Sequence, residues 1–183
     1  ERIREPAGAD AVGRHLDLEV DNVRTTLGSI DPEALADVVA HLADAGRHVY
    51  VLSGDASLGV AQQFVGDLTA LRDGVSILNG NEVAVRRQVA LVRPDDVVVT
   101  IDLRRYDAWL VDAAGGVREA GAWCLAITDS LLSPLTALAD RTFVLGAASV
   151  GPFDSHVGTL ALLNLLAAGV ADRLRDVAAD RLD

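Results

Sequence analysis

Five short apolar runs that alternate with helical patterns constrain the fold of this chain more than any other feature. The strongest run, Asp96–Ile101, contains Val-Val-Val-Thr-Ile and is apolar on both faces, as is Ala122–Ile127. Runs of this kind, rich in β-branched residues, are typical of strands buried inside a parallel sheet. The predicted strands are His48–Leu52, Val75–Leu78, Asp96–Ile101, Ala122–Ile127 and Arg141–Leu145.

Helical patterns occupy the segments between these strands and both ends of the chain. The clearest start signal is Asp31 followed by Pro32, because an acid at the N-cap and a proline at the first helical position both favour a helix. The predicted helices are Asp10–Leu27, Pro32–Ala45, Ser57–Arg72, Glu82–Val92, Tyr106–Ala120 and Phe153–Leu182, with a short helix opened by Ser133-Pro134. The alternation predicts an α/β fold, a three-layer α/β/α sandwich around a five-stranded parallel sheet.

The chain shows no linker, repeat or low-complexity segment, so we expect residues 1–183 to form one domain. Residues 1–45 are expected to be helices that pack on the sheet or on a dimer partner. Half of the residues are hydrophobic and only 4% are aromatic, which predicts an aliphatic core. Because the chain begins at Glu1 and has no methionine, we expect a further segment upstream.

The formal net charge of −11 disfavours direct binding to nucleic acid or to anionic lipid, both of which attract Lys and Arg. The single cysteine, Cys124, cannot form a disulfide within the chain, and a reducing, cytoplasmic setting is expected. No apolar stretch has the length of a membrane span and no signal peptide is visible, so neither membrane insertion nor secretion is expected. The positions of His15, His41, His48 and Cys124 do not show the spacing that is typical of metal ligands.

Three loops follow the strongest strands at their carboxyl ends, where parallel sheets bind ligands. The first, Ser53–Ser57, opens a helix, so its backbone N–H groups and the helix dipole favour an anion, with the Ser57 hydroxyl as a further donor. Ser53, Gly54 and Ser57 are therefore candidate ligand contacts. The alternative is that Ser57 only caps its helix.

The same loop is a loose variant of the dinucleotide-binding fingerprint, with Gly54, Ala56 and Gly59 in place of the three glycines. That fingerprint needs an acid at the end of the second strand, and Leu78–Asn81 provides none before Glu82. We therefore expect no nucleotide cofactor.

Arg104 and Arg105 directly follow the Asp96–Ile101 strand, and guanidinium groups bind phosphate or carboxylate through paired hydrogen bonds. They are the strongest candidate anion contacts, and Asp102 lies beside them. The alternative is a local ion-pair cluster, in which Asp102 and Asp107 neutralise the arginines without any ligand. Asp102 would repel a phosphate unless an arginine compensates its charge.

The third loop adds Thr128 and Ser130 as candidate contacts, although Asp129-Ser130 and Ser133-Pro134 are also typical of turns and helix caps. His156 precedes the last helical segment. It is a candidate acid–base group or ligand contact, because imidazole titrates near neutral pH, and the alternative is a purely structural role.

The stretches Ser53–Ser57, Ile101–Tyr106 (Ile-Asp-Leu-Arg-Arg-Tyr) and Ala126–Leu135 (Ala-Ile-Thr-Asp-Ser-Leu-Leu-Ser-Pro-Leu) resemble the sugar isomerase (SIS) domain, specifically the C-terminal effector domain of RpiR-type transcriptional regulators. The resemblance covers nearly the whole chain, and the last stretch is its most specific part. It implies a flavodoxin-like SIS fold, a homodimer, and a phosphosugar or related metabolite as ligand. DNA would be bound only through a helix-turn-helix domain upstream.

Two departures from the family pattern bear on the ligand. SIS domains that bind phosphosugars usually carry Ser-x-Ser-Gly-x-Thr in the second loop, where this chain has Asp-Leu-Arg-Arg-Tyr-Asp over Asp102–Asp107. In this second loop the chain resembles a subgroup of the regulators that carries an Arg-Arg-Tyr sequence. Ser53 and Asp55 also stand where glycines are common. The resemblance therefore implies a small anionic or polar metabolite held through the arginines, in place of a standard phosphosugar cradle.

The leading hypothesis from the sequence is a ligand-sensing, dimerising effector domain of an RpiR-type regulator, with neither catalysis nor a cofactor. A first alternative is an aldose–ketose sugar-phosphate isomerase, for which Glu82 and His156 are the candidate base and proton donor. A second is a dimerisation module with a decayed ligand site, which Asp55 and Asp102 would favour. Aliphatic segments such as Leu160–Leu166 would then bury against a symmetric partner.

Overall fold

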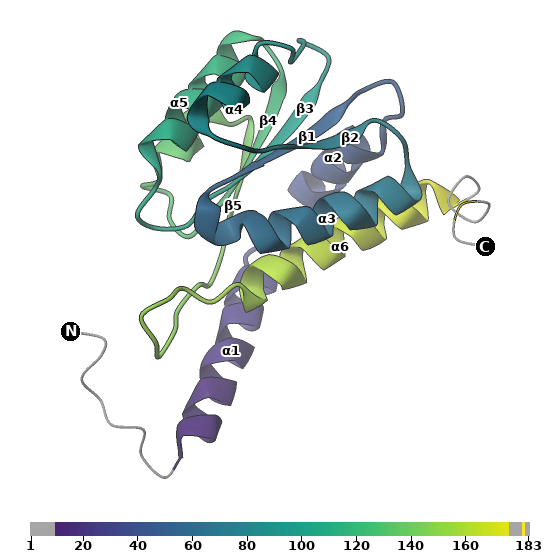
Figure 1. Cartoon of the computed structure of the whole chain (residues 1–183). Helices are drawn as coiled ribbons and strands as arrows, with labels where there is room; N and C mark the ends of the chain where they lie inside the picture. The colour runs from purple at the N-terminus through teal and green to yellow at the C-terminus, as the bar shows by residue number, and fades with distance from the viewer. Residues whose placement is uncertain (1–9, 176–180, 182–183) are drawn as a thin grey trace.

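Five parallel strands form one sheet in the computed structural model, which describes residues 10–175 and residue 181 of the chain. The strands are β1 (Val49–Ser53), β2 (Val75–Leu78), β3 (Val97–Ile101), β4 (Trp123–Thr128) and β5 (Arg141–Val144). They lie in the order β2-β1-β3-β4-β5, and every neighbouring pair is parallel (Figure 1). The predicted fold class is confirmed, and each predicted strand is present close to its predicted bounds.

Six α-helices and two short 3-10 turns complete the described part of the chain. They are α1 (Ala11–Gly28), α2 (Pro32–Ala43), α3 (Leu58–Leu71), α4 (Glu82–Val89), α5 (Ala108–Glu119) and α6 (Val157–Arg173), with η1 (Asp55–Ser57) and η2 (Pro134–Leu138). None of these helices is long and apolar enough to cross a membrane.

The predicted start of the last helix is wrong, because α6 begins at Val157 and not at Phe153. The Ser155 hydroxyl accepts a hydrogen bond from the backbone N–H of Val157 (3.2 Å). This local bond holds the residues before Val157 in a bend and delays the first helical turn. The predicted end of the same helix, Leu182, lies outside the described residues.

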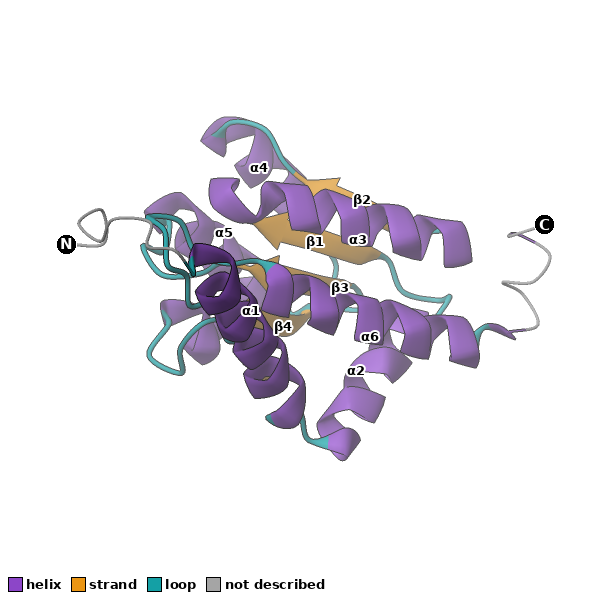
Figure 2. Ribbon diagram, turned by 90° about the horizontal axis from the view of Figure 1, so that it is seen from below, coloured by secondary structure: helices purple, strands orange, loops and turns teal. Residues whose placement is uncertain are grey.

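Helices cover both faces of the sheet (Figure 2). Each face has its own apolar core. On one face, α2, α3 and α6 contribute fully buried side chains such as Phe64 and Leu166. On the other face, α4 and α5 pack around Leu110 and Val98. All five residues of β3 are buried, which explains why its sequence is apolar on both faces.

The sheet changes direction at β1, because β2 lies on one side of it and β3 on the other. The register aligns Ser53 with Ile101 and Ile101 with Ile127, so three strands end at the same level. The N–H of Gly54 donates to the Ile101 carbonyl (3.1 Å), and that of Asp102 to the Ile127 carbonyl (3.1 Å). The loops after β1, β3 and β4 therefore lie side by side, where doubly wound sheets leave a crevice.

Of the N-terminal helices, α2 joins the core beside the sheet, whereas α1 packs on α6 and on the segment after β5. Two glycines allow this close approach. A Cβ at Gly158 would lie 2.5 Å from the Gly146 carbonyl oxygen, and one at Gly146 would lie 2.9 Å from Asn22 Cα. The Asn22 amide also binds the backbone of Ala148 through its nitrogen (2.8 Å) and its oxygen (3.0 Å). The far end of α1 extends away from the rest of the molecule (Figure 1).

Arg72 is a structural residue that the sequence analysis missed. It lies just before β2, at the end of the sheet opposite the ligand loops, and is only 3% exposed. Its guanidinium donates hydrogen bonds to the carbonyl oxygens of Leu42 (2.6 Å), Asp44 (2.8 Å) and Asp73 (2.9 Å), and also to that of Arg47. Arg72 thereby satisfies carbonyls at the end of α2, which no local sequence pattern indicates.

Candidate ligand-binding site

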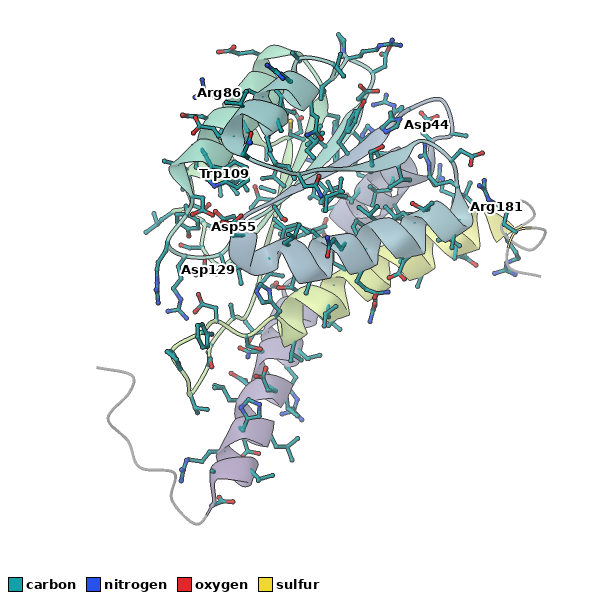
Figure 3. The ribbon with its side chains drawn as sticks, viewed as in Figure 1. Asp44, Asp55, Arg86, Trp109, Asp129 and Arg181 are labelled. Carbon is teal, nitrogen blue, oxygen red and sulfur yellow. The ribbon has the colours of Figure 1, made fainter. Side chains whose placement is uncertain are left out.

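A pocket of about 260 Å³ opens at the carboxyl ends of β1 and β3. It is formed by η1, the loop after β3 and the segment before α6. Its lining residues are Asp55, Ala56, Asp102, Leu103, Arg104, Arg105, Asp107, Pro152, Phe153, Asp154 and His156. Figure 3 labels Asp55 and Asp129 on this side of the molecule and Asp44 on the other side.

A wider hollow of about 670 Å³ lies between α4 and α5, lined mainly by apolar and small residues such as Val89 and Gly116. It lies on the outer helical layer, away from the strand ends. We assign the candidate site to the smaller pocket because charged side chains from three separate segments converge there.

Asp102 forms the floor of the pocket and is only 5% exposed. One of its oxygens accepts a hydrogen bond from the backbone N–H of Asp107 (3.0 Å). A Cβ at Gly54 would lie 2.4 Å from its other oxygen, so a larger residue at position 54 would force the Asp102 side chain to move. Burial raises the pKa of Asp102 to about 6, and the negative charges of Asp107 and Asp129 also raise it. Hydrogen bonds from backbone N–H groups act in the opposite direction and lower this pKa.

Arg104 is paired, but not with the aspartates that flank it in the sequence. Its Nε (2.7 Å) and Nη2 (2.6 Å) both bind Asp154 Oδ1, and its Nε lies 4.0 Å from Asp129 Oδ2. The hypothesis of a local cluster with Asp102 and Asp107 is therefore wrong for Arg104. The pair instead links the loop after β3 to the segment before α6, across the pocket.

Arg105 differs from Arg104 in its backbone and in its partners. Its φ of 71° is in the left-handed region, and the residue is exposed at the pocket. Among the described residues, no ion pair or hydrogen bond engages its guanidinium. Arg105 is therefore the cation that the pocket can offer to a ligand, held by a strained backbone conformation that is common at functional sites.

Tyr106 connects the second and third loops. Its hydroxyl donates to Asp129 Oδ1 (2.9 Å), and burial, together with that bond, raises the pKa of the phenol. Ser130 forms a turn, because its hydroxyl accepts the N–H of Leu132 (3.1 Å). The predicted cap at Ser133 is present, with the hydroxyl accepting from Leu135 N–H.

Three hydroxyls at the strand ends, those of Ser53, Ser57 and Thr128, are buried and have no hydrogen-bond partner within the described residues. The alternative role of Ser57 as a side-chain cap is wrong: it stands at the N-cap position of α3 but makes no capping bond. The 3-10 turn η1 already gives Ser57 a helical backbone, whereas a capping side chain normally requires an extended one.

His156 lies at the N-cap position of α6 and lines the pocket. Burial lowers the pKa of its imidazole, while the Ala56 carbonyl and the charge of Asp154 oppose that shift. Glu82, its predicted partner in an isomerase, is exposed on α4, pairs with Arg86 (2.8 Å) and does not line the pocket. The structure therefore does not bring the predicted acid–base pair together.

The structure thus divides the predicted contacts into two groups. Asp102, Arg104, Arg105 and His156 line the pocket, whereas Ser53, Gly54, Ser57, Thr128 and Ser130 do not. Sequence analysis missed Asp107, Phe153 and Asp154, although each is near a predicted contact in sequence. Within the described residues, no group of three or more His, Cys, Asp or Glu side chains could hold a metal ion.

The domain is a doubly wound α/β sandwich with a polar pocket at the point where the strand order reverses. This architecture is typical of small-molecule-binding domains. The family model of the SIS domain matches residues 41–169, and this chain belongs to the SIS domain family. No match is found among curated protein sequences.

Solved structures agree with this assignment. The sugar isomerase domain of an RpiR transcription factor from Sphaerobacter thermophilus shares 29% identity, covers 94% of this chain and 96% of its own, and has a TM-score of 0.86. The Vibrio vulnificus NanR protein, complexed with ManNAc-6P, shares 18% identity over 94% of this chain and 67% of its own, with a TM-score of 0.80. A phosphoheptose isomerase from Francisella tularensis shares 16% identity over 92% of this chain and 98% of its own, with a TM-score of 0.70.

Proposed function

We propose that this chain is the ligand-sensing, dimerising effector domain of an RpiR-type transcriptional regulator. Its ligand is a small anionic or polar metabolite, a sugar phosphate or another carbohydrate derivative, bound in the strand-end pocket. The observation that carries this proposal is the pocket itself, at the point where the strand order of the sheet reverses. There the guanidinium of Arg105 has no partner among the described residues. DNA would be bound by a helix-turn-helix domain upstream, which fits the net charge of −11.

The similar structures support both parts of this proposal. The Sphaerobacter thermophilus domain belongs to an RpiR transcription factor and matches nearly all of this chain. NanR holds ManNAc-6P on the same fold, which favours a carbohydrate derivative as the ligand.

Contacts between the pocket and α1 provide a route for signalling. Asp154 and His156 line the pocket, and Ser155 between them donates a hydrogen bond from its hydroxyl to Glu19 Oε2 on α1 (2.5 Å). A ligand that draws Arg105 towards this segment would also shift Ser155 and with it α1. Because α1 is the described helix nearest the N-terminus, such a shift would reach a DNA-binding domain upstream.

A thermal-shift screen of the chain against sugar phosphates, sugar acids and amino acids tests the proposal. A ligand present at a hundredfold its dissociation constant adds about 2.7 kcal/mol to the free energy of unfolding. We expect Arg105→Ala to bind the ligand found in this way about tenfold more weakly than wild type, since one charged hydrogen bond is lost. Arg87→Ala, which removes an exposed arginine of α4 outside the pocket, is the matched control.

Two results would contradict the proposal. Binding that is equally strong in Arg105→Ala and wild type would place the ligand elsewhere. A screen in which no compound raises the melting temperature would instead favour the dimerisation module with a decayed site.

Catalysis as a sugar-phosphate isomerase is a second candidate function, and one observation favours it. Asp102 lies in the pocket with a pKa of about 6, which suits an acid–base group at neutral pH. Turnover of an aldose phosphate to its ketose, abolished in Asp102→Asn, would support this function. A chain that binds the same sugar phosphate without turnover would exclude that reaction and support sensing.

A further inference from the structure

Arg104 is the second guanidinium of the pocket, and a carboxylate of the same chain already binds it. Its Nε (2.7 Å) and Nη2 (2.6 Å) both bind one oxygen of Asp154, across the pocket. Asp129 Oδ2 lies 4.0 Å from the same Nε, outside hydrogen-bond distance. Two nitrogens on one oxygen form a weaker arrangement than the paired contact of a guanidinium with two oxygens of a carboxylate or phosphate. An anionic ligand can therefore offer Arg104 a better partner than Asp154.

Solvent reaches this ion pair. The side chain of Arg104 is 40% exposed, and that of Asp154 is 15% exposed. Such a pair adds little to stability, because water screens the charges and both side chains lose conformational freedom. Core packing does not hold the Asp154 side of the pair in place either, since Pro152 and Phe153 are exposed. The pair can therefore open without disturbing either apolar core.

The other charges of the pocket make Arg104 important to an anion. Among the residues that line the pocket, Arg104 and Arg105 are the only arginines. Three carboxyl groups line it in addition to that of Asp154, and they belong to Asp55, Asp102 and Asp107. Like charges repel strongly in a partly enclosed space. An anion bound at Arg105 therefore gains a second attractive charge only when Arg104 leaves Asp154.

We propose that Asp154 is an internal competitor of the ligand for Arg104 and thereby sets the affinity of the pocket for anions. Its carboxylate binds Arg104 where an anionic group of the ligand would bind. A ligand that takes over Arg104 displaces Asp154 together with the exposed residues before it. The next residue, Ser155, donates a hydrogen bond to Glu19 on α1 (2.5 Å), so the displacement is passed directly to α1. This inference rests on the proposed sensing function and identifies the contact that the ligand has to break.

Nuclear magnetic resonance titration of the chain with inorganic phosphate, at constant ionic strength, tests the role of Asp154. We expect Asp154→Asn to bind phosphate at least about fivefold more tightly than wild type, as the loss of one solvent-exposed ion pair provides. Arg104→Ala in the Asp154→Asn background should abolish this gain, because Arg104 is the group that is released. Asp154→Ala gives the same comparison if Asp154→Asn does not fold.

Asp73→Asn is the matched control. Asp73 is likewise paired with an arginine, Arg181 (2.6 Å), but it lies just before β2, at the end of the sheet opposite the pocket. Its substitution should leave the affinity for phosphate unchanged. Hydrogen exchange in the absence of phosphate provides a second measurement. Asp154→Asn should accelerate exchange in α1 near Glu19, and Asp73→Asn should not.

Three results would overturn the inference. Phosphate binding that is no tighter in Asp154→Asn than in wild type, or absent from both, would show that Asp154 does not compete for Arg104. A gain that persists after Arg104→Ala would place the phosphate on another group. Unchanged exchange of α1 in Asp154→Asn would reject the connection with α1.

The metabolite screen judges the sensing function separately. If the screen finds a ligand and Asp154→Asn gains no phosphate binding, the sensing function remains supported through Arg105 and only the competitor role fails. If the screen finds none while Asp154→Asn gains phosphate binding, the sensing function fails and the competitor role is retained.

Discussion

Asp102 is the residue that most distinguishes this pocket from a phosphate site. Its side chain occupies the place of a hydroxyl in the usual family motif, and Gly54 is the residue that makes room for it. Burying a carboxylate next to two other acids stabilises its protonated form. The chain therefore keeps a destabilising group at its candidate site, which is typical of residues retained for function.

We predict that the free-energy cost of burying the Asp102 carboxylate depends on pH. The folded chain protonates Asp102 near pH 6, whereas the unfolded chain does so near the ordinary value of 3.8. Between these values the folded state binds more protons, so the contribution of Asp102 to stability falls as the pH rises through about 6. The free energy of unfolding of Asp102→Asn should therefore exceed that of wild type by about 3 kcal/mol near neutral pH, and this gain should decline towards pH 4.

Urea denaturation of both proteins over this pH range measures the difference directly, because contributions from other titrating groups cancel. A gain in stability that is constant across the range would show that Asp102 titrates normally in the folded chain.

At the scale of elements, periodicity predicted the fold almost completely. The buried runs of β3 and β4 and the Asp31-Pro32 start of α2 are local signals, and the structure follows them. The pocket was less predictable. The pair between Arg104 and Asp154 joins residues far apart in sequence, so their neighbours in the chain suggested the wrong partners. Strand order, which brings the two segments together, cannot be deduced from local patterns.

The contact between α1 and α6 leads to a second prediction. Gly158 lies against the Gly146 carbonyl and 2.6 Å from Thr26 Oγ1, measured from an ideal Cβ position. Gly158→Ala should destabilise the chain by about 1–3 kcal/mol, because backbone atoms must move apart. The substitution should also accelerate hydrogen exchange more in α1 than in α3, since the contact with α6 holds α1 in place.

Gly66→Ala is the matched control for that change. Gly66 lies within α3 with nothing within 4 Å of an added Cβ, so alanine should stabilise the helix by about 0.5–1 kcal/mol. Equal stability of the Gly158→Ala chain and wild type would mean that the α1–α6 contact is looser than the structure describes.

At the scale of the whole molecule, α1 is only partly covered by its own chain. Val12 is 83% exposed and Leu16 is 60% exposed, and both belong to the first half of α1. The far end of this helix extends from the body (Figure 1). Spaced four residues apart, Val12 and Leu16 share one face of the helix. Apolar side chains grouped in this way mark an interaction surface, and a second copy of the chain supplies an identical one.

We therefore predict that the chain is a homodimer and that α1 contributes to its interface. Leu16→Asp should weaken the dimer at least about tenfold, because burying an unpaired carboxylate costs more than one apolar contact gains. Sedimentation equilibrium over a range of concentrations measures this change. Val83→Asp introduces the same charge at an exposed valine of α4 and should leave the dimer intact. If Val83→Asp weakens the dimer and Leu16→Asp does not, the interface lies on the α4–α5 side, and the ligand signal must reach DNA by a route other than Ser155 and α1.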